Sequence, residues 1–217
     1  MAIITAQEIV ARVNKLLNDN GYVRWPKEEL LNYLNDAQKA IVLRRPDAHT
    51  VDIDDFECVQ GTKQRLPADA LRLIDITRNS SGRAIKGPFD RTVLDDNYPD
   101  WYADAPQAYA EHYIYDQRNP KTFYLHPAVA ANTEITLVYS KSPDVISVNQ
   151  LDSGEVIGLD DIYLNAIIEW VMYRAYMKDA EYAANSNKSL MHLNAFKSQM
   201  GEKTQADGSM AGQEIKE

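Results

Sequence analysis

Apolar residues recur every three or four positions along the first 50 residues, which is the period of an amphipathic helix. Thr5 and Glu8 form a capping-box pattern at the start of a first helix, and the pair Asn20-Gly21 ends it. A second helix is predicted after Pro26, because proline favours the first helical turn. The two apolar stripes are Ile9, Val13, Leu16 and Leu17 in the first helix and Leu30, Leu34, Ala37 and Ile41 in the second. Two amphipathic helices joined by so short a link are expected to pair antiparallel.

The period changes from residue 51 onward, where aromatic and β-branched residues alternate with polar ones. Short strands are predicted at residues 51–53, on either side of the turn at Gln60-Gly61, and at 71–76, 109–116, 121–126 and 133–140. Prolines bound the stretch 89–105, for which the sequence predicts a long loop with one helical turn. The middle of the chain is therefore expected to form a small antiparallel sheet.

Helical periodicity returns after a polar link at residues 152–158. The stretch 160–182 is apolar on nearly all sides, which indicates a helix that is covered on nearly all sides. A fourth helix is predicted from about residue 187, and the glycine-containing segment 201–217 has too few large apolar groups to fold by itself.

These patterns together predict an α+β fold. The N- and C-terminal helices, residues 1–50 and 159–200, are expected to form one helical bundle. Residues 51–158 are predicted to be a β-rich insertion in that bundle, and residues 201–217 a flexible C-terminal tail. We find no internal repeat.

Charge and composition narrow the function classes. The chain has 23 Lys and Arg against 32 Asp and Glu, a formal net charge of -9, so its overall field disfavours gripping nucleic-acid phosphates. One cysteine, Cys58, excludes an intrachain disulfide framework, and we expect it to be a small buried residue. No apolar run approaches the roughly 20 residues that a membrane-spanning helix needs, so no membrane association is expected. The N-terminus does not have the pattern of a secretory signal.

Catalytic signatures are sparse in this sequence. The four histidines are dispersed, and the sequence contains no GxSxG, P-loop or GxGxxG motif. Carboxylates cluster at Asp52, Asp54 and Asp55, and again at Asp95 and Asp96. A solvated acidic surface is the interpretation we favour, since the spacing is not that of a calcium-binding loop. The alternative is a carboxylate-dependent metal hydrolase that uses the first of these clusters.

The apolar third helix has two open interpretations. Four of its residues are candidates for packing between subunits: Ile167, Trp170, Val171 and Tyr176. A helix that needs more cover than a small sheet and two helices provide indicates a second subunit. Equally, it can be the central helix of a monomeric bundle.

Three sequence segments carry a family resemblance. They are TAQEIVARVNKLLNDNGYVRWPKEELLNYLNDAQKAIVLRRPDA, GTKQRLPADALRLIDITRN and RNPKTFYLHP. With them the chain resembles, from about Thr5 to Tyr182, the head-to-tail adaptor proteins of short-tailed bacteriophages, the group that includes tail tubular protein A. The resemblance implies a structural protein of the virion neck, assembled in the host bacterial cytoplasm, with no cofactor, no catalytic residues and no metal site.

The same resemblance implies the partners. Such adaptors form a ring, usually of twelve copies, between the portal protein and the tail nozzle, with possible contact to tail fibres, and double-stranded DNA passes through the ring. The C-terminal segment commonly engages the portal, and the candidate contact residues here are Leu190, Leu193, Phe196, Met200, Met210 and Ile215. Asp54, Asp55, Asp95 and Asp96 are candidates for lining the channel, where carboxylates would repel phosphates. A head-completion or tail-terminator ring protein is a further alternative.

Overall fold

The chain divides into two compact units. The computed structural model describes residues 3–178, 181 and 183–211, and for residues 202–211 it describes the backbone alone. We call the unit made of residues 1–45 and 143–217 the helical unit, and the unit made of residues 46–142 the β-rich unit. The predicted α+β class, with helices from both ends of the chain packed together and antiparallel strands between them, is confirmed.

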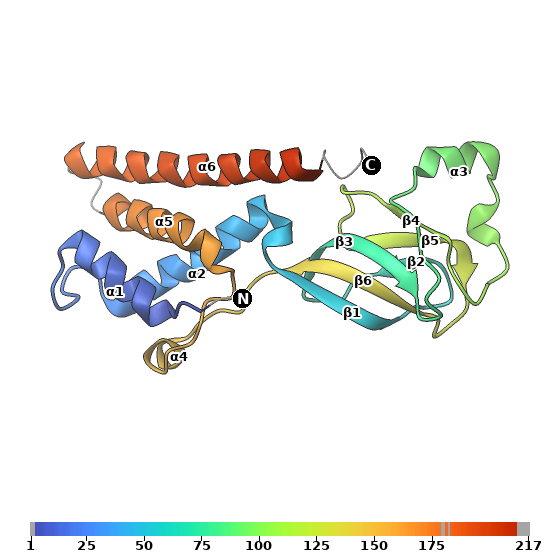
Figure 1. Cartoon of the computed structure of the whole chain (residues 1–217), viewed down its shortest axis with the longest axis horizontal. Helices are drawn as coiled ribbons and strands as arrows, with labels where there is room; N and C mark the ends of the chain where they lie inside the picture. The colour runs from blue at the N-terminus through green and yellow to red at the C-terminus, as the bar shows by residue number, and fades with distance from the viewer. Residues whose placement is uncertain (1–2, 179–180, 182, 212–217) are drawn as a thin grey trace. The chain divides into compact units, whose positions relative to one another are not determined.

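The helical unit is built around one central helix. Its elements are α1 (Ala6–Leu17), α2 (Lys27–Arg44), α4 (Val148–Asp152), the 3-10 turn η3 (Asp161–Tyr163), α5 (Leu164–Met177) and α6 (Ala183–Ala211). α5 packs against α6 on one side and against α1 and α2 on the other (Figure 1). Helices of its own chain therefore cover much of the apolar circumference of α5, while Trp170 and Tyr176 stay partly exposed.

Local sequence accounts for the start and the end of α1. The Thr5 backbone N–H donates to Glu8 Oε2 at 2.9 Å, and the Glu8 N–H donates back to Thr5 Oγ1 at 3.2 Å, so the predicted capping box is present. Asn18 ends the helix in the left-handed conformation, with φ at 55°. The next residue, Asp19, accepts three backbone N–H groups of the loop to α2, including that of Trp25 at 2.9 Å. The link between α1 and α2 is thus a fixed turn.

The second boundary between the units lies earlier than the predicted residue 159. Residues 143–158 belong to the helical unit because two buried side chains of α2 bind them. Asn35 Nδ2 donates to the Ile146 carbonyl at 2.9 Å, and the Gly158 N–H donates to Gln38 Oε1 at 2.8 Å. The side chains that make these contacts are polar amides, which leave no periodic apolar pattern in the sequence. Sequence analysis therefore did not predict the contacts.

Helix α6 is longer than predicted. The sequence placed its end near Met200, followed by a flexible tail, whereas the helix runs on to Ala211. Gly201 and Gly208 each cost roughly 1 kcal/mol relative to alanine in a helix. Extending a helix that is already formed on α5 costs little, and the strong helix formers around these glycines favour the extension. Residues 212–217 of the predicted tail lie outside the described residues.

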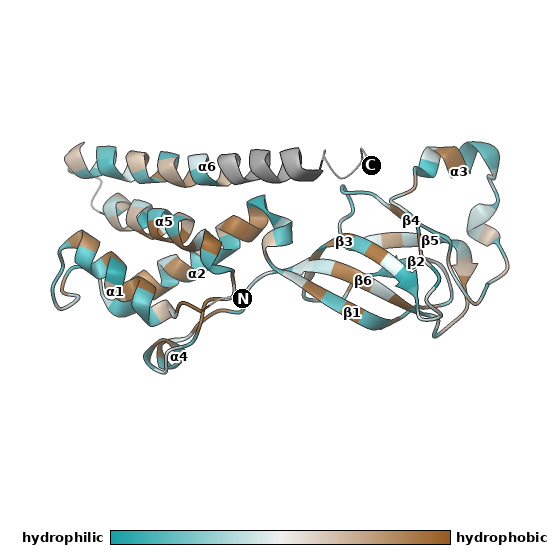
Figure 2. Cartoon of the chain, viewed as in Figure 1, coloured by the Kyte–Doolittle hydropathy of each residue, from teal (hydrophilic) through white to brown (hydrophobic). Residues whose placement is uncertain are grey.

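The β-rich unit is two antiparallel three-stranded sheets rather than one. The first has the order β1 (Thr50–Glu57), β6 (Glu134–Lys141), β3 (Ala70–Asn79), and the second has the order β2 (Gly61–Arg65), β5 (Thr122–Val129), β4 (His112–Tyr115). Alternate residues of both sheets enter one core, which contains among others Leu73, Ile76, Tyr113, Phe123, Leu125, Ile135 and Leu137. The two sheets thus pack face to face as a small sandwich. Figure 2 shows the alternation of apolar and polar residues along these strands.

A segment after β3 pairs with β4 at the edge of the second sheet. Ile85 and its neighbours run beside β4, where the Lys86 N–H donates to the Glu111 carbonyl and the Phe89 N–H donates to the Tyr113 carbonyl. Gly87 is required at this edge, since a Cβ there would lie 2.6 Å from the Tyr113 carbonyl oxygen.

We call residues 89–106 the cap segment; it holds α3 (Arg91–Asn97) and the 3-10 turn η2 (Trp101–Ala103). Its apolar residues Leu94 and Trp101 pack on Ile114 and Tyr124 of the second sheet. The prediction of a long loop with one helical turn was therefore wrong.

Candidate interaction surfaces

The first acidic pair, Asp54 and Asp55, lies on the edge strand β1. Both side chains are exposed, at a bulge where the pairing of β1 with β6 shifts register between Ile53 and Phe56. Asp52, two residues earlier on the same strand, is exposed as well. These carboxylates form an acidic strip on the surface of the first sheet.

The second acidic pair lies on α3, in the cap segment. Asp95 has a structural role there: its Oδ1 accepts the Trp101 indole N–H at 2.8 Å, and its Oδ2 accepts the Arg91 Nε–H at 3.1 Å. The hydrogen bond from Trp101, together with Arg91, lowers the pKa of Asp95. Asp96 is exposed. The two predicted pairs therefore sit on separate elements and do not form one cluster.

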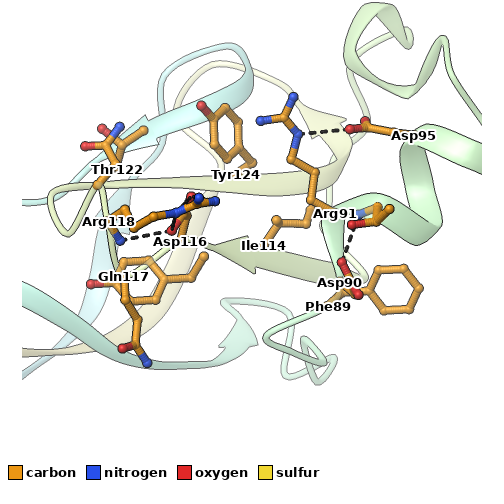
Figure 3. A pocket seen from close by; sticks show the side chains of 13 residues that line it. Phe89, Asp90, Arg91, Asp95, Ile114, Asp116, Gln117, Arg118, Thr122 and Tyr124 are labelled. Carbon is orange, nitrogen blue, oxygen red and sulfur yellow. Dashed lines mark hydrogen bonds and ion pairs between the residues drawn. The ribbon is translucent and has the colours of Figure 1, made fainter.

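Asp95 also lines a cleft of about 640 Å³ between the cap segment and the end of β4. Figure 3 shows Arg91 and Arg118 on its two sides, with Tyr124 and Ile114 between them. Arg118 pairs with Asp116 through its Nε and Nη2, at 2.9 to 3.1 Å. Both guanidinium groups thus already have a carboxylate partner in the fold. Sequence reasoning missed this cleft, because its walls come from segments that no shared motif connects.

The hydrolase alternative gains no support from the geometry. Among the residues that the structure describes, no three His, Cys, Asp or Glu side chains converge as a metal-binding group. Cys58 is buried, as predicted, and burial raises the pKa of its thiol to about 12. A thiol with such a pKa is a packing group at neutral pH and not a nucleophile.

His126 of β5 lies beneath the cap segment. Its Nδ1 is 3.9 Å from Asp104 Oδ2, and the centroid of its ring is 6.2 Å from that of Trp101 and 6.4 Å from that of His112. Burial lowers the pKa of His126 below its ordinary value of 6.5, against the opposing effect of Asp104. The folded chain therefore holds this proton less tightly than the unfolded chain does.

We expect the stability of the chain to fall as the pH drops below about 6.5, because the unfolded state then binds the His126 proton first. The variant His126→Gln cannot titrate and is expected to flatten this dependence. Urea midpoints measured between about pH 7 and about pH 5.5 test the prediction, since carboxylates titrate mainly at lower pH. If the urea midpoints of the wild type and of His126→Gln change equally with pH, groups other than His126 cause the pH dependence of stability.

The four candidates for subunit packing divide between core and surface. Ile167 and Val171 are fully buried within the helical unit, so their side chains are already used inside one subunit. Trp170 and Tyr176 are partly exposed. The Trp170 ring packs on Phe196 of α6, with centroids 5.0 Å apart, and the Tyr176 ring stacks on His192 at 5.6 Å.

The six candidates for portal contact divide in the same way. Phe196 and Met200 are buried, Leu193 is half-buried and Leu190 is 55% exposed. Met210 lies in the part of α6 whose backbone alone is described, and Ile215 lies outside the described residues. The structure thus leaves Leu190 and part of Leu193 for contact with another protein.

Residues 4–215 match the SU10 adaptor protein family, which is nearly the whole chain and includes both units. The chain belongs to the SU10 adaptor protein family. It is thereby a phage head-to-tail adaptor, as its resemblance predicted, and a phage virion protein. The family is one of structural adaptors, which favours a non-enzymatic role. No curated protein matches the chain.

The helical unit of this adaptor exposes apolar side chains that sequence reasoning missed. The most exposed are Ile3, Val23, Leu43, Ile162 and Met191. Leu43 lies outside the apolar stripe of α2 that contains Leu34 and Ile41. This position in the sequence already indicates that the Leu43 side chain is exposed. No helix among the described residues of the adaptor is both long and apolar enough to cross a bilayer.

Proposed function

We propose that this adaptor forms a ring of twelve copies between the portal and the tail nozzle of a short-tailed phage, with the genome passing through the ring. Membership of a phage head-to-tail adaptor family is the observation that carries the proposal. The ring, its copy number and its partners come from the resemblance to the tail tubular protein A group. Tail fibres are candidate partners on the same basis.

The end of α6 is the part we assign to the portal. α6 has 29 residues and α5 has 14, so by helix rise they extend about 43 Å and about 21 Å. The two helices run antiparallel, since Tyr176 stacks on His192 whereas Trp170 contacts Phe196. Residues 201–211 therefore extend past the start of α5 (Figure 1). We propose that this overhang, with the residues after it, reaches the portal.

Native mass spectrometry of the full chain, alone and with the portal protein of the same phage, tests both parts. The expected species are a multiple of 24.6 kDa and a complex with the portal. A variant that ends at Met200 should lose the portal complex but keep its stability, since Phe196 and Met200 still hold α6 on α5. A monomer that ignores the portal contradicts the proposal. Imaging of the particle then separates an adaptor from a head-completion or tail-terminator ring by its position.

We also propose that the exposed carboxylates Asp54, Asp55 and Asp96 line the DNA channel, because phosphate-binding side chains there would slow passage. Asp95 was predicted with them, but its contacts with Arg91 and Trp101 make it a poor test residue.

Reversing the charge of Asp54, Asp55 and Asp96 to lysine is expected to slow genome ejection, because new cations would bind the sliding phosphates. Ejection from purified particles, followed by the fluorescence of a DNA dye, measures the rate, and the delay should shrink as salt rises. Substitution of the same residues by asparagine is the control for shape. Unchanged ejection in the lysine variant would place these residues outside the channel.

A further inference from the structure

A pocket at one edge of the second sheet is lined by cations and by no carboxylate. Its volume is about 370 Å³, within the range of about 300–1,000 Å³ that is typical of small-ligand sites. Its walls are the end of β2, the turn that follows β2 and the chain that leads into β5. The basic side chains among its lining residues are Lys63, Arg65 and Lys121. We call it the β2–β5 pocket.

The strand pattern of β2 brings two of these cations together. The side chains of Thr62 and Gln64 are buried, so those of Lys63 and Arg65 lie on the other face of the strand. Two residues in alternate positions of one strand are about 7 Å apart, so both long side chains are able to contact one small ligand. Arg65 pairs with Thr122 of β5, which places Thr122 beside them.

The fold does not neutralise the three cations. The side chains of Lys63 and Arg65 make no hydrogen bond and no ion pair with any residue that the structure describes. The Lys121 amine donates one hydrogen bond, to the Ala68 carbonyl at 3.3 Å, and its other two N–H groups have no described partner. Like charges that share a pocket repel each other, so an anion bound among them lowers this repulsion.

Three carboxylates lie near the pocket residues in sequence, and none of them lines the pocket. Asp69 lies 3.5 Å from the Lys141 amine, and Asp116 binds Arg118 at 2.9 Å. Glu57 is exposed in a neighbouring hollow and makes no ion pair with any described residue. The β2–β5 pocket therefore keeps its positive charge.

Thr122 is an independent sign of a ligand. It is only 8% exposed, yet its hydroxyl makes no hydrogen bond within the described part of the chain. It lines both the β2–β5 pocket and the adjoining cleft of Figure 3. A buried hydroxyl without a partner destabilises a fold, and a ligand oxygen in the pocket supplies the missing acceptor.

We propose that the β2–β5 pocket binds a phosphate group, either inorganic phosphate or the end of a small phosphomonoester. Such a group carries a charge of about −1.5 to −2 at neutral pH, which three cations match better than they match the single charge of a carboxylate. The Arg65 guanidinium donates to two phosphate oxygens. Lys63 and Lys121 supply charge, and the Thr122 hydroxyl donates to a further oxygen. This site does not depend on the ring of the proposed function.

The surroundings of the pocket disfavour DNA as the source of the phosphate. Duplex DNA carries one negative charge per about 1.7 Å, so its backbone would run on beyond the pocket. The neighbouring hollow contains Glu57, and the neighbouring cleft contains three Asp side chains against two Arg. These carboxylates repel a polyanion that extends past the pocket, but not a single phosphate inside it.

A titration of the full chain with sodium phosphate, at constant pH and ionic strength, tests the site. Amide shifts measured by NMR should change saturably at residues 61–68 and 119–124 and stay constant elsewhere. Glycerol 3-phosphate in a parallel titration separates the two sources. Binding at least as tight as that of phosphate assigns a phosphomonoester, and weaker binding assigns inorganic phosphate.

Two variants locate the binding groups. Arg65→Gln is expected to weaken phosphate binding roughly tenfold, and Thr122→Val, which keeps the side-chain shape, roughly threefold. Arg78→Gln is the matched control, because it removes the same charge from an exposed position of β3 outside the pocket, and it should bind phosphate like the wild type. Arg65 is exposed, so its variant keeps the test decisive even if Thr122→Val does not fold.

Four results overturn the inference. They are the absence of saturable shifts, binding of acetate as tight as that of phosphate, equal weakening by Arg65→Gln and Arg78→Gln, and shifts at the pocket that appear with a duplex oligonucleotide but with neither phosphate compound. The third result would show attraction to the net charge alone, and the fourth would assign the pocket to DNA.

Discussion

Replacing Phe196 with alanine is expected to destabilise the helical unit by about 3–5 kcal/mol, which is typical for truncating a fully buried phenylalanine. Phe196 has no exposed surface, and its ring centroid lies 5.0 Å from that of Trp170. The guanidinium of Arg44 lies 5.0 Å from the same ring, on α2. One side chain thus holds α6 on α5 and also meets α2. Urea unfolding followed by circular dichroism measures the loss.

Leu190→Ala is the matched control for this prediction. It removes a large apolar group from the same helix, but from a side chain that is 55% exposed. Surface substitutions of this kind change stability by roughly 0.5 kcal/mol or less. If the two variants lose the same stability, α6 is not held on α5 through Phe196. If residues 201–211 bind the portal, Phe196→Ala should also bind the portal more weakly than the wild type, because α6 no longer holds these residues in place.

The helices and most strands could be predicted because each has a local cause. The Thr5 and Glu8 caps lie within one turn of each other, and the stripe from Leu30 to Ile41 stays on one side of a single helix. The alternation along β6 likewise places Ile135 and Leu137 in the core. In each case a few neighbouring residues decide the structure, so a pattern along the chain is enough.

The surfaces could not be predicted in this way, because they depend on contacts between distant segments. One apolar stripe in the sequence of α6 contains Leu190, Leu193, Phe196 and Met200. Packing on α5 buries Phe196 and Met200 but leaves Leu190 exposed. Leu190 lies about 120° around the helix from Phe196 at 100° per residue, and that angle separates surface from core. Only the position of α5 reveals where the division falls.

The cap segment shows the same limit on the β-rich unit. Its helical turns are short, and the sheet residues that fix them, Ile114 and Tyr124, come later in the chain. Asp95 was predicted as part of an acidic surface, and it is exposed, but its carboxylate also accepts the Trp101 indole N–H. A local acidic pattern does not distinguish a surface charge from a hydrogen-bond acceptor.

Replacing Trp101 with alanine is expected to release the cap segment and to destabilise the chain by about 3–5 kcal/mol. Trp101 is buried against Ile114 and Tyr124, and its indole N–H has Asp95 as its partner. Its removal leaves a cavity over the second sheet and exposes the apolar area of Leu94. Amide hydrogen exchange should show faster exchange for the cap segment, with little change in the helical unit, which shares no part of this cluster.

Val93→Ala on α3 is the matched control, since this side chain of the same segment is 45% exposed and its truncation leaves the Trp101 contacts in place. Asp95→Ala is the informative intermediate, because it removes the indole's acceptor and keeps the ring. The variant loses one hydrogen bond but no buried apolar area, so its stability should fall between those of the other two. If Asp95→Ala is as stable as Val93→Ala, packing alone holds the cap segment, and Asp95 returns to the set of candidates for the DNA channel.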